Sequence, residues 1–302
     1  MSLIQITSGV RRPEARLPEW LRKSAVDFPA LHALKTELRS RNLHTVCESA
    51  RCPNIHECFA RKAATFMILG DICTRTCGFC AVPQGAPGSL DVDEPVNVAD
   101  MAARMGLRYV VLTSVNRDDL ADGGSYHFGR TVKAVRKALP EAQVETLIPD
   151  FEGDLDAVQR VLDSGPHVLN HNMETVARLY RRVRPQADYR RSLGVLGFAK
   201  SWRPETLTKS GLMVGLGESQ DEVRALMDDL RAYDVDVVTI GQYLQPRRHR
   251  LPVEEYVRPE VFERYREYGE ELGFRAVFSG PLVRSSYMAE HVEARASAGL
   301  GD

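Results

Sequence analysis

The sequence predicts an α/β protein built from parallel strand–helix units, because short apolar runs alternate with longer stretches of helical period. Seven runs bounded by Gly, Pro, Asp or Ser are typical of strands: Thr65–Leu69, Arg108–Thr113, Gln143–Ile148, His167–Leu169, Gly211–Val214, Val235–Ile240 and Arg275–Phe278. Six stretches between them carry apolar residues at helical spacing: Val98–Met105, Arg130–Ala138, Leu155–Ser164, Glu174–Arg182, Glu218–Tyr233 and Val261–Leu272. Buried parallel strands are apolar throughout, as is Tyr109-Val110-Val111-Leu112. This alternation implies parallel β/α units.

Composition narrows the class of protein. The 302 residues could form one barrel-sized domain or two ordinary ones, and 43% apolar residues are enough for a sizeable core. A net charge of −1 gives no electrostatic reason to expect a nucleic-acid partner. The first twenty residues contain no apolar signal segment, and no run is apolar enough to span a membrane. We therefore expect a cytoplasmic protein without a membrane partner.

Basic residues gather in three short segments despite the neutral overall charge. These are Arg181-Arg182-Val183-Arg184, Arg190-Arg191 and Arg247-Arg248-His249-Arg250. Most clusters of this kind are solvated faces. A partner protein with an acidic surface is the alternative interpretation.

All six cysteines fall into two triplets, and the second has the more specific spacing. Cys73, Cys77 and Cys80 form the pattern C-x3-C-x2-C with Phe79 just before the last cysteine. One short loop of this kind can bind three irons of a cubane and leave the fourth iron for another ligand. A structural zinc site with a spare thiol is the alternative, since C-x2-C is common in zinc sites.

The first triplet, Cys47, Cys52 and Cys58, has gaps of four and five residues, too wide for a zinc knuckle. The stretch 48–57 contains Pro53, Asn54 and His56, which favour an irregular loop over a helix. A disulfide framework is the competing interpretation. Without a secretory route, cysteines in a reducing compartment more often bind metal or act in catalysis.

These motifs together resemble the lipoyl synthase family of the radical S-adenosylmethionine (SAM) superfamily. The resemblance rests on both triplets, separated by fourteen residues, and on Arg284-Ser285-Ser286-Tyr287 near the C-terminus. It extends through FMILGDICTRTCGFCAV (66–82), TSVNRDDLADGG (113–124), LNHNMETVARLY (169–180), KSGLMVGLGE (209–218) and TIGQYLQP (239–246). Only the first forty or so residues and the last dozen lack the family's landmarks.

The resemblance implies a more definite architecture. The fold would be a partial (β/α)6 barrel of the TIM type, open on one side, with extensions at both ends that carry an auxiliary iron–sulfur cluster. We expect an N-terminal extension at 1–62, the barrel at 63–280 and a C-terminal tail at 281–302.

The resemblance also implies the reaction and its cofactors. Two sulfur atoms would be inserted at C6 and C8 of a protein-bound octanoyl group. No side-chain acid or base can remove such alkane hydrogens. The family uses a 5′-deoxyadenosyl radical made from SAM, two SAM per lipoyl group, and two [4Fe-4S] clusters, of which the auxiliary cluster is the source of sulfur.

The cluster ligands carry over by motif. Cys73, Cys77 and Cys80 would hold the radical-generating cluster, whose fourth iron binds SAM. Cys47, Cys52 and Cys58 would hold the auxiliary cluster, with Ser286 as a hard oxygen ligand that suits a bond broken later. From spacing alone a helix N-cap is the better interpretation of Ser286, and the resemblance reverses that preference. Ser285 stays open as the ligand.

Polar residues near the strand ends are the expected lining for SAM and substrate, because working groups of such barrels gather at the carboxyl ends of strands. The set consists of Thr113, Ser114, Asn116, Glu145, Asn170, Asn172 and Gln242, and the aromatic Phe79 of the cysteine motif is expected to contact the cofactor as well. Each taken singly could be an ordinary turn or cap residue. The turn Gly215-Leu216-Gly217-Glu218 is also expected beside SAM. His44 and His56 are expected to be structural or to contact a partner, and Arg284 to position the tail or be exposed.

Several partners follow from the resemblance. They are octanoylated lipoyl carrier domains (dehydrogenase-complex E2 subunits and the glycine-cleavage H protein), an electron donor such as flavodoxin or ferredoxin, and an iron–sulfur carrier for cluster repair. We expect a monomer, because the open side of the barrel has to admit a whole domain. A tRNA methylthiotransferase and a ferredoxin-type electron-transfer protein are the alternative functions, but the first usually ends in a basic RNA-binding domain and the second needs four cysteines per cubane.

Overall fold

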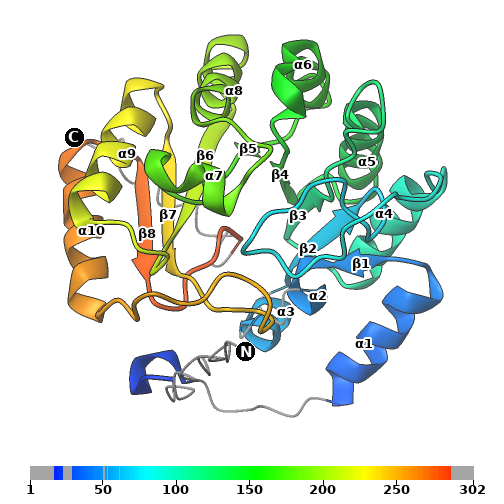
Figure 1. The fold of residues 1–302 in the computed structure, drawn as a ribbon. Helices are drawn as coiled ribbons and strands as arrows, with labels where there is room; N and C mark the ends of the chain where they lie inside the picture. The colour runs from blue at the N-terminus through cyan, green and yellow to red at the C-terminus, as the bar shows by residue number, and fades with distance from the viewer. Residues whose placement is uncertain (1–16, 23–28, 50–51, 53, 61, 287–302) are drawn as a thin grey trace, which may run out of the picture.

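A curved eight-stranded sheet forms the centre of the computed structural model, which describes residues 17–22, 29–49, 52, 54–60 and 62–286. The strands are β1 His44–Thr45, β2 Ala63–Ile68, β3 Tyr109–Ser114, β4 Gln143–Leu147, β5 Val168–Asn170, β6 Leu207–Val214, β7 Val237–Gln242 and β8 Ala276–Gly280. They lie in sequence order, with β2 to β8 parallel and β1 antiparallel to β2. Figure 1 shows the strands in an arc with the longer helices outside it.

Helices follow the strands, as the sequence pattern predicts. They are α1 Pro29–Ser40, α2 Val46–Ser49, α3 Ile55–Ala60, α4 Glu94–Arg104, α5 Ser125–Ala138, α6 Leu155–Leu162, α7 Tyr180–Val183, α8 Tyr189–Trp202, α9 Gln220–Ala232 and α10 Pro259–Glu271. Three single turns are 3₁₀ helices: η1 Glu19–Leu21, η2 Phe151–Gly153 and η3 Ala177–Leu179. Side-chain caps mark several starts, among them Asp154 before α6 and a capping box of Ser219 and Glu222 at α9.

This architecture confirms the predicted partial (β/α)6 barrel. Six β/α units run from β2 to β7, and β8 completes the parallel set at the far edge of the sheet. All seven predicted strands are present, with ends shifted by a few residues. The two-residue β1 was not predicted, and it brings part of the expected N-terminal extension into the barrel sheet. The domain boundaries at 62 and 280 stay a prediction.

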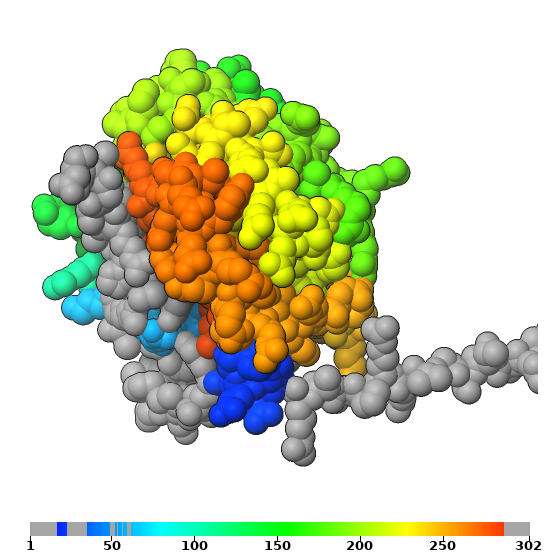
Figure 2. Space-filling model, turned by 90° about the vertical axis from the view of Figure 1, so that its left-hand side faces the viewer, coloured from blue at the N-terminus to red at the C-terminus, as the bar shows by residue number. Residues whose placement is uncertain are grey.

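The core is built on both faces of this sheet. β2 and β7 are buried along their whole length, because helices cover the outer face and neighbouring strands fill the inner one. Figure 2 shows α9 and α10, yellow and orange, as one continuous surface on the side of the molecule that carries β8. No helix in the described ranges is long and apolar enough to cross a membrane.

The helix predicted at Glu174–Arg182 was wrong over its first half. Glu174 has a φ of 65°, and its segment bridges to Leu212 of β6. The Glu174 N–H donates to Gly211, and its carbonyl accepts the N–H of Met213. These contacts with a strand far along the chain override the helical pattern, so regular turns begin only at η3 and α7.

The helix that packs in this unit is α8, which was not predicted. Its two glycines, Gly194 and Gly197, lower its intrinsic helix propensity. Gly197 is there for packing, since an added Cβ would lie 2.7 Å from the ring of Tyr233. Buried Leu193, Leu196 and neighbours supply the apolar face, and tertiary contact outweighs propensity.

Candidate functional site

The loop that carries the second cysteine triplet begins just after β2 and is fastened by backbone hydrogen bonds. The Cys73 N–H donates to Pro83, and the Gly85 N–H donates back to Cys73. The Thr74 N–H donates to the carbonyl of Asn116, beyond the end of β3, over 3.1 Å. The loop is therefore docked at the carboxyl ends of the strands, as predicted.

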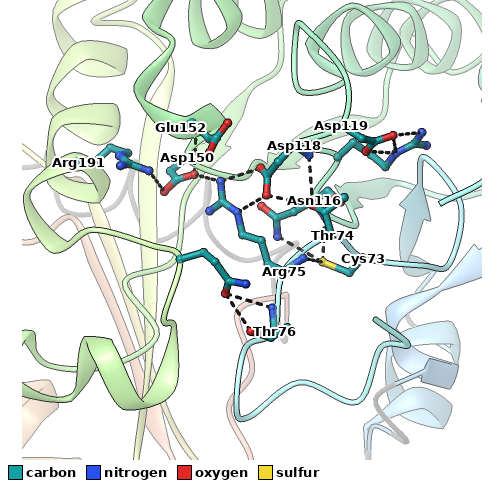
Figure 3. Close-up of polar contacts among 12 residues, drawn as sticks. Cys73, Thr74, Arg75, Thr76, Asn116, Asp118, Asp119, Asp150, Glu152 and Arg191 are labelled. Carbon is teal, nitrogen blue, oxygen red and sulfur yellow. Dashed lines mark hydrogen bonds and ion pairs between the residues drawn. The ribbon is translucent and has the colours of Figure 1, made fainter. Parts of the chain in front are cut away.

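The sulfur of Cys73 is surrounded by donors (Figure 3). It accepts the backbone N–H of Asn116 at 3.3 Å and that of Arg75 at 3.4 Å, and Nδ2 of Asn116 lies at 3.7 Å. Donors aimed at a ligand sulfur orient it and tune the potential of a bound cluster. Asn116, predicted as a cofactor contact, thus touches a cluster ligand.

Cys77 and Cys80 complete this triplet in a more buried setting. Burial raises the pKa of Cys77 to about 12, against the opposing charge of Arg184 and with further upward contributions from Cys80 and Cys73. Burial also raises the pKa of Cys80. Three mutually interacting soft donors fit an iron–sulfur cluster, whose irons would hold them as thiolates.

Gly78, between Cys77 and Cys80, is held on two sides. Its N–H donates to Val183 of α7, and its carbonyl accepts the N–H of Leu251. An added Cβ would lie 2.8 Å from the Leu251 side chain. The lack of a side chain at this position lets the loop pass between α7 and the segment after β7.

The first triplet lies on and around two short helices, where a largely irregular loop was expected. Cys47 is in α2, Cys58 is in α3, and the Cys52 N–H donates to the Cys47 carbonyl. Burial, and after it the charges of Cys52 and Cys58, raise the pKa of Cys47 to about 12. The three thiols are thus neighbours, and none of the six cysteines, all of which lie in the described residues, forms a disulfide.

Neither triplet has the geometry of a site for one metal ion. Among the described residues, no three His, Cys, Asp or Glu side chains converge as such ligands would. A cubane has a different requirement, because each thiolate binds a separate iron.

The C-terminal tail lies against the first triplet. Nδ2 of Asn54 donates to the Leu282 carbonyl at 2.7 Å. The Val283 carbonyl lies over Gly241 of β7, where an added Cβ would be 2.1 Å away. Arg284 is half-buried, and burial lowers the pKa of its guanidinium while the charge of Cys52 opposes this. Ser285 and Ser286 follow directly, and the residues after Ser286, on which the alternative role as a helix cap depends, lie outside the described ones.

Three of the predicted lining residues carry buried polar atoms that have no partner among the described residues. These atoms are Oγ of Ser114, Oδ1 of Asn170 and Oδ1 of Asn172. Nε2 of His171 also has no partner among the described residues. His171 lies between the two asparagines in the sequence and was not predicted as a site residue. Buried polar groups normally have hydrogen-bond partners. The cluster of unpaired atoms at the ends of β3 and β5 therefore fits a polar ligand such as SAM.

Other predicted residues are already engaged by the protein. Glu145 accepts from the Tyr109 hydroxyl, Asn170 and Lys209, and its ion pair with Lys209 is fully buried. Oγ1 of Thr113 donates to Leu147.

Gln242 likewise binds only protein groups within the described part of the chain. It donates to the carbonyls of Val214, Tyr243 and Glu255 and accepts the N–H of Val257. Phe79 packs against the apolar cluster of the C-terminal barrel half. Contact of these residues with SAM or substrate stays a prediction.

The glycine turn after β6 is closed by its own glutamate. Glu218 accepts the N–H groups of Gly215 and Leu216. Gly215 has a φ of 98°, and an added Cβ would lie 2.4 Å from the Glu255 carbonyl. This turn shapes the site without offering those two N–H groups to a ligand.

Arg184 is a site residue that sequence reasoning assigned to a basic surface cluster. It is buried, donates to the carbonyls of Asn172 and Met173, and lies 5.5 Å over the Tyr180 ring. Its charge lowers the pKa of Cys77. The only sign of this burial in the sequence is that Arg184 directly follows the apolar Val183.

Comparisons with known proteins agree with this geometry. Residues 67–230 match the radical SAM superfamily, and residues 6–52 match the N-terminal domain of lipoyl synthase. The chain is 55% identical over 272 residues to the lipoyl synthase of Rubrobacter xylanophilus, covering 90% of this chain and 85% of that protein. It is 53% identical over 298 residues to that of Symbiobacterium thermophilum, covering 99% and 93%.

Solved structures show the same fold at low identity. Methylornithine synthase superposes with a TM-score of 0.52 at 14% identity, covering 84% of this chain and 79% of that one. HydG, a maturase of the [FeFe]-hydrogenase, gives a TM-score of 0.54 at 12% identity, covering 88% and 64%.

We predict that His171 makes stability depend on pH. Burial, and then the charge of Arg184, lower the pKa of His171 to about 4, whereas an unfolded histidine titrates near 6.5. Below about pH 6.5 the unfolded chain binds the extra proton, so the unfolding free energy falls between pH 6.5 and 4, by about 3 kcal/mol in all. In iron-free protein, His171→Gln should flatten this slope in denaturant titrations. The exposed His249→Gln is the control; equal slopes for wild type and His171→Gln would contradict the prediction.

Proposed function

The chain belongs to the lipoyl synthase family of radical SAM enzymes, and we propose that its two cysteine triplets divide the reaction between a radical-generating cluster and a sulfur-donating one. The reaction inserts two sulfur atoms at C6 and C8 of an octanoyl chain amide-linked to a carrier-protein lysine. The observation that carries the proposal is two separate thiol triplets, each of mutually interacting cysteines. Identity of 53–55% to curated lipoyl synthases removes the support for a tRNA methylthiotransferase or a ferredoxin.

Cys73, Cys77 and Cys80 would hold the [4Fe-4S] cluster that, when bound, supplies the electron for SAM cleavage. Asn116 and the Arg75 N–H orient the Cys73 sulfur through hydrogen bonds. Arg184 contributes a buried positive charge near Cys77, which favours the thiolate in a site that otherwise disfavours charge. These groups would bind and orient the cluster.

SAM would bind where the unpaired polar atoms lie. Ser114, Asn170 and Asn172 offer one hydroxyl and two amide oxygens, which suit the ribose hydroxyls and the amino groups of SAM. Asn172 keeps its place because Nδ2 donates to Glu174 at 2.9 Å and Gly211 leaves room beside it. We propose these three residues as SAM or substrate contacts.

Cys47, Cys52, Cys58 and Ser286 would hold the auxiliary [4Fe-4S] cluster. Support for Ser286 comes from the tail, whose Leu282 carbonyl binds Asn54 of the cysteine loop and whose Arg284 interacts with Cys52. A serine oxygen binds soft iron less firmly than a thiolate, which suits a cluster that gives up its sulfur.

The partners proposed for this chain are octanoylated carrier domains, a protein reductant and an iron–sulfur carrier. A basic rim supports an acidic partner. Gly78 of the cluster loop is hydrogen-bonded to Val183 and Leu251, and the exposed Arg181, Arg247 and Arg248 lie two to four residues along the chain from those two positions. Flavodoxins and ferredoxins are the electron donors that we propose for this rim. A cytoplasmic location and a monomeric state stay predictions.

Removing one cysteine from each triplet tests the division of labour. Cys77→Ala should abolish SAM cleavage and sulfur insertion while iron stays at the first triplet. Cys52→Ala should still cleave SAM and abstract hydrogen from an octanoylated peptide but form no C–S bond. Each variant controls for the other, in assays of 5′-deoxyadenosine, lipoyl product and iron per chain. If Cys77→Ala forms 5′-deoxyadenosine at the native rate, or if Cys52→Ala makes a sulfur-containing product, the proposed division of roles between the two triplets is wrong.

Ser286 is tested by two substitutions of opposite effect. As a cap alone, Ser286→Ala would cost about 1 kcal/mol of stability and leave sulfur insertion intact. As a ligand, Ser286→Ala should impair sulfur insertion while SAM is still cleaved, and Ser286→Cys should assemble the cluster but release sulfur poorly. Ser285→Ala is the matched control. Wild-type sulfur insertion by both Ser286 variants would transfer the ligand role to Ser285 or an external group.

The basic rim predicts a specific loss with protein reductants. Arg247→Glu with Arg248→Glu should slow SAM cleavage driven by reduced flavodoxin about tenfold or more at low salt, because charge complementarity raises association rates. Cleavage driven by dithionite should be unchanged. Lys137→Glu, on the exposed end of α5, is the control. Equal losses with both reductants would argue against a docking role.

A further inference from the structure

The cluster loop contains a buried arginine that belongs to neither triplet. Arg75 lies between Cys73 and Cys77, and its side chain is only 3% exposed. A guanidinium stays charged at any ordinary pH, so burying it requires carboxylate partners. The family resemblance assigned this residue no role, and its side-chain contacts come from two other segments of the chain.

Arg75 makes a two-pronged ion pair with Asp118 and a further pair with Asp150. Nε and Nη2 donate to the two Asp118 oxygens, each at 2.8 Å, and Nη2 lies 2.7 Å from Oδ1 of Asp150 (Figure 3). Burial disfavours the charge, yet these hydrogen bonds raise the pKa of Arg75. Asp118 follows β3 and Asp150 follows β4, so one side chain joins the cluster loop to two strand ends.

Several contacts hold the side chain of Asp150 in the position where it meets Arg75. Its side chain is fully buried, accepts the N–H of Glu152, and is contacted by Arg191 of α8 at 3.4 Å. Phe151 and Glu152, directly after it, have φ values of 45° and 54°. Left-handed conformations at two non-glycine residues carry a strain that the packing around them must offset. The ion pairs of the buried Asp150 with Arg75 and Arg191, directly before this turn, are among the contacts that can offset the strain.

The segment that carries Asp118 also holds the sulfur of Cys73. Thr74 donates through Oγ1 to Asp118 and through its N–H to Asn116, and Asn116 donates to the Cys73 sulfur. Any shift of residues 73–75 relative to 116–118 would therefore move the Cys73 ligand atom. A displacement near 1 Å can cost roughly 10²-fold in rate when reacting groups must be aligned.

We propose that Arg75 is a positioning residue for the radical-generating cluster. Its ion pairs with Asp118 and Asp150 hold the cysteine loop in register with β3 and β4, so that the cluster faces the unpaired polar atoms at the strand ends. Lysine cannot replace it, because an ammonium lacks the planar fork that engages both carboxylates. The proposal rests on the proposed function for the identity of the bound cluster.

The barrel contains a matched control for Asp150 at its opposite end. Asp236, just before β7, is also buried and contacts two cations, Lys200 at 2.8 Å and Arg275 at 3.1 Å. Asp236→Asn should therefore disturb a similar buried network without touching the cluster loop. Comparison of Asp150→Asn with Asp236→Asn separates positioning from general stability.

The first test uses iron-free protein, so its result does not depend on SAM chemistry. The amides of Cys73, Thr74 and Gly78, all hydrogen-bonded in the loop, should exchange with solvent about tenfold faster or more in Arg75→Lys and Asp150→Asn. They should exchange at wild-type rates in Asp236→Asn. Wild-type protection in Arg75→Lys, or equal loosening in Asp236→Asn, would overturn the proposal.

The second test uses cluster-loaded protein. Arg75→Lys should keep its iron but show an altered electron paramagnetic resonance signal of the reduced cluster on adding SAM, and less lipoyl product per 5′-deoxyadenosine. Should that variant fail to fold, Asp118→Asn replaces it, because Asp118 is 26% exposed and contributes one edge of the network. A wild-type signal and product ratio in a folded variant would refute the role. If wild type itself shows no SAM chemistry, the proposed function fails, whereas the exchange result still decides the positioning role.

Discussion

The docking of residues 73–75 onto residues 116–118 is the contact on which the rest of the site depends. Parallel pairing of β2 and β3 sets Ile68 beside Ser114, so both loops leave the sheet at the same edge. Where the two loops meet, the Thr74 N–H donates to the Asn116 carbonyl, and the Cys73 sulfur accepts the Asn116 N–H. A cluster bound by this loop must then face the carboxyl ends of the strands, where a parallel barrel collects its working groups.

Polar groups at the strand ends differ in whether the protein itself supplies their hydrogen-bond partners. Glu145 lies two residues below the end of β4, where Tyr109, Lys209 and Asn170 complete its hydrogen bonds. Asn170 combines both situations, because its Nδ2 binds Glu145 while its Oδ1 has no partner in the described residues. Leaving buried polar atoms unpaired is costly without a ligand. The unpaired atoms of Ser114, Asn170 and Asn172 are therefore the ones that a polar cosubstrate would stabilise.

The described part of the C-terminal tail lies against the first cysteine loop. The tail reaches the first cysteine loop through Asn54 and Leu282, and it crosses β7 where Gly241 leaves no side chain in its path. A substituent at Gly241 would push away the backbone that leads to Ser286. The relative placement of the two thiol triplets therefore depends on backbone packing over β7 as much as on the cysteines.

The sequence by itself determined the strand–helix alternation, both thiol triplets and most strand-end residues, because each depends on a local pattern of hydrophobicity or spacing. Ser114, Asn170 and Asn172 were found because they follow apolar strands directly. Tertiary structure decided the rest. The pairing of Glu174 with β6 takes the place of the first half of a predicted helix. Arg184, which was predicted in a basic surface cluster, is buried at the site.

Arg75 illustrates the physical reason. Its partners Asp118 and Asp150 lie 43 and 75 positions away along the chain, and nothing in the local spacing of CTRTC relates them. Whether such a charge is solvated or paired depends on which strand ends the barrel brings together. Periodicity and motif spacing report on neighbours along the chain, whereas the free energy of a buried ion pair depends on neighbours in space.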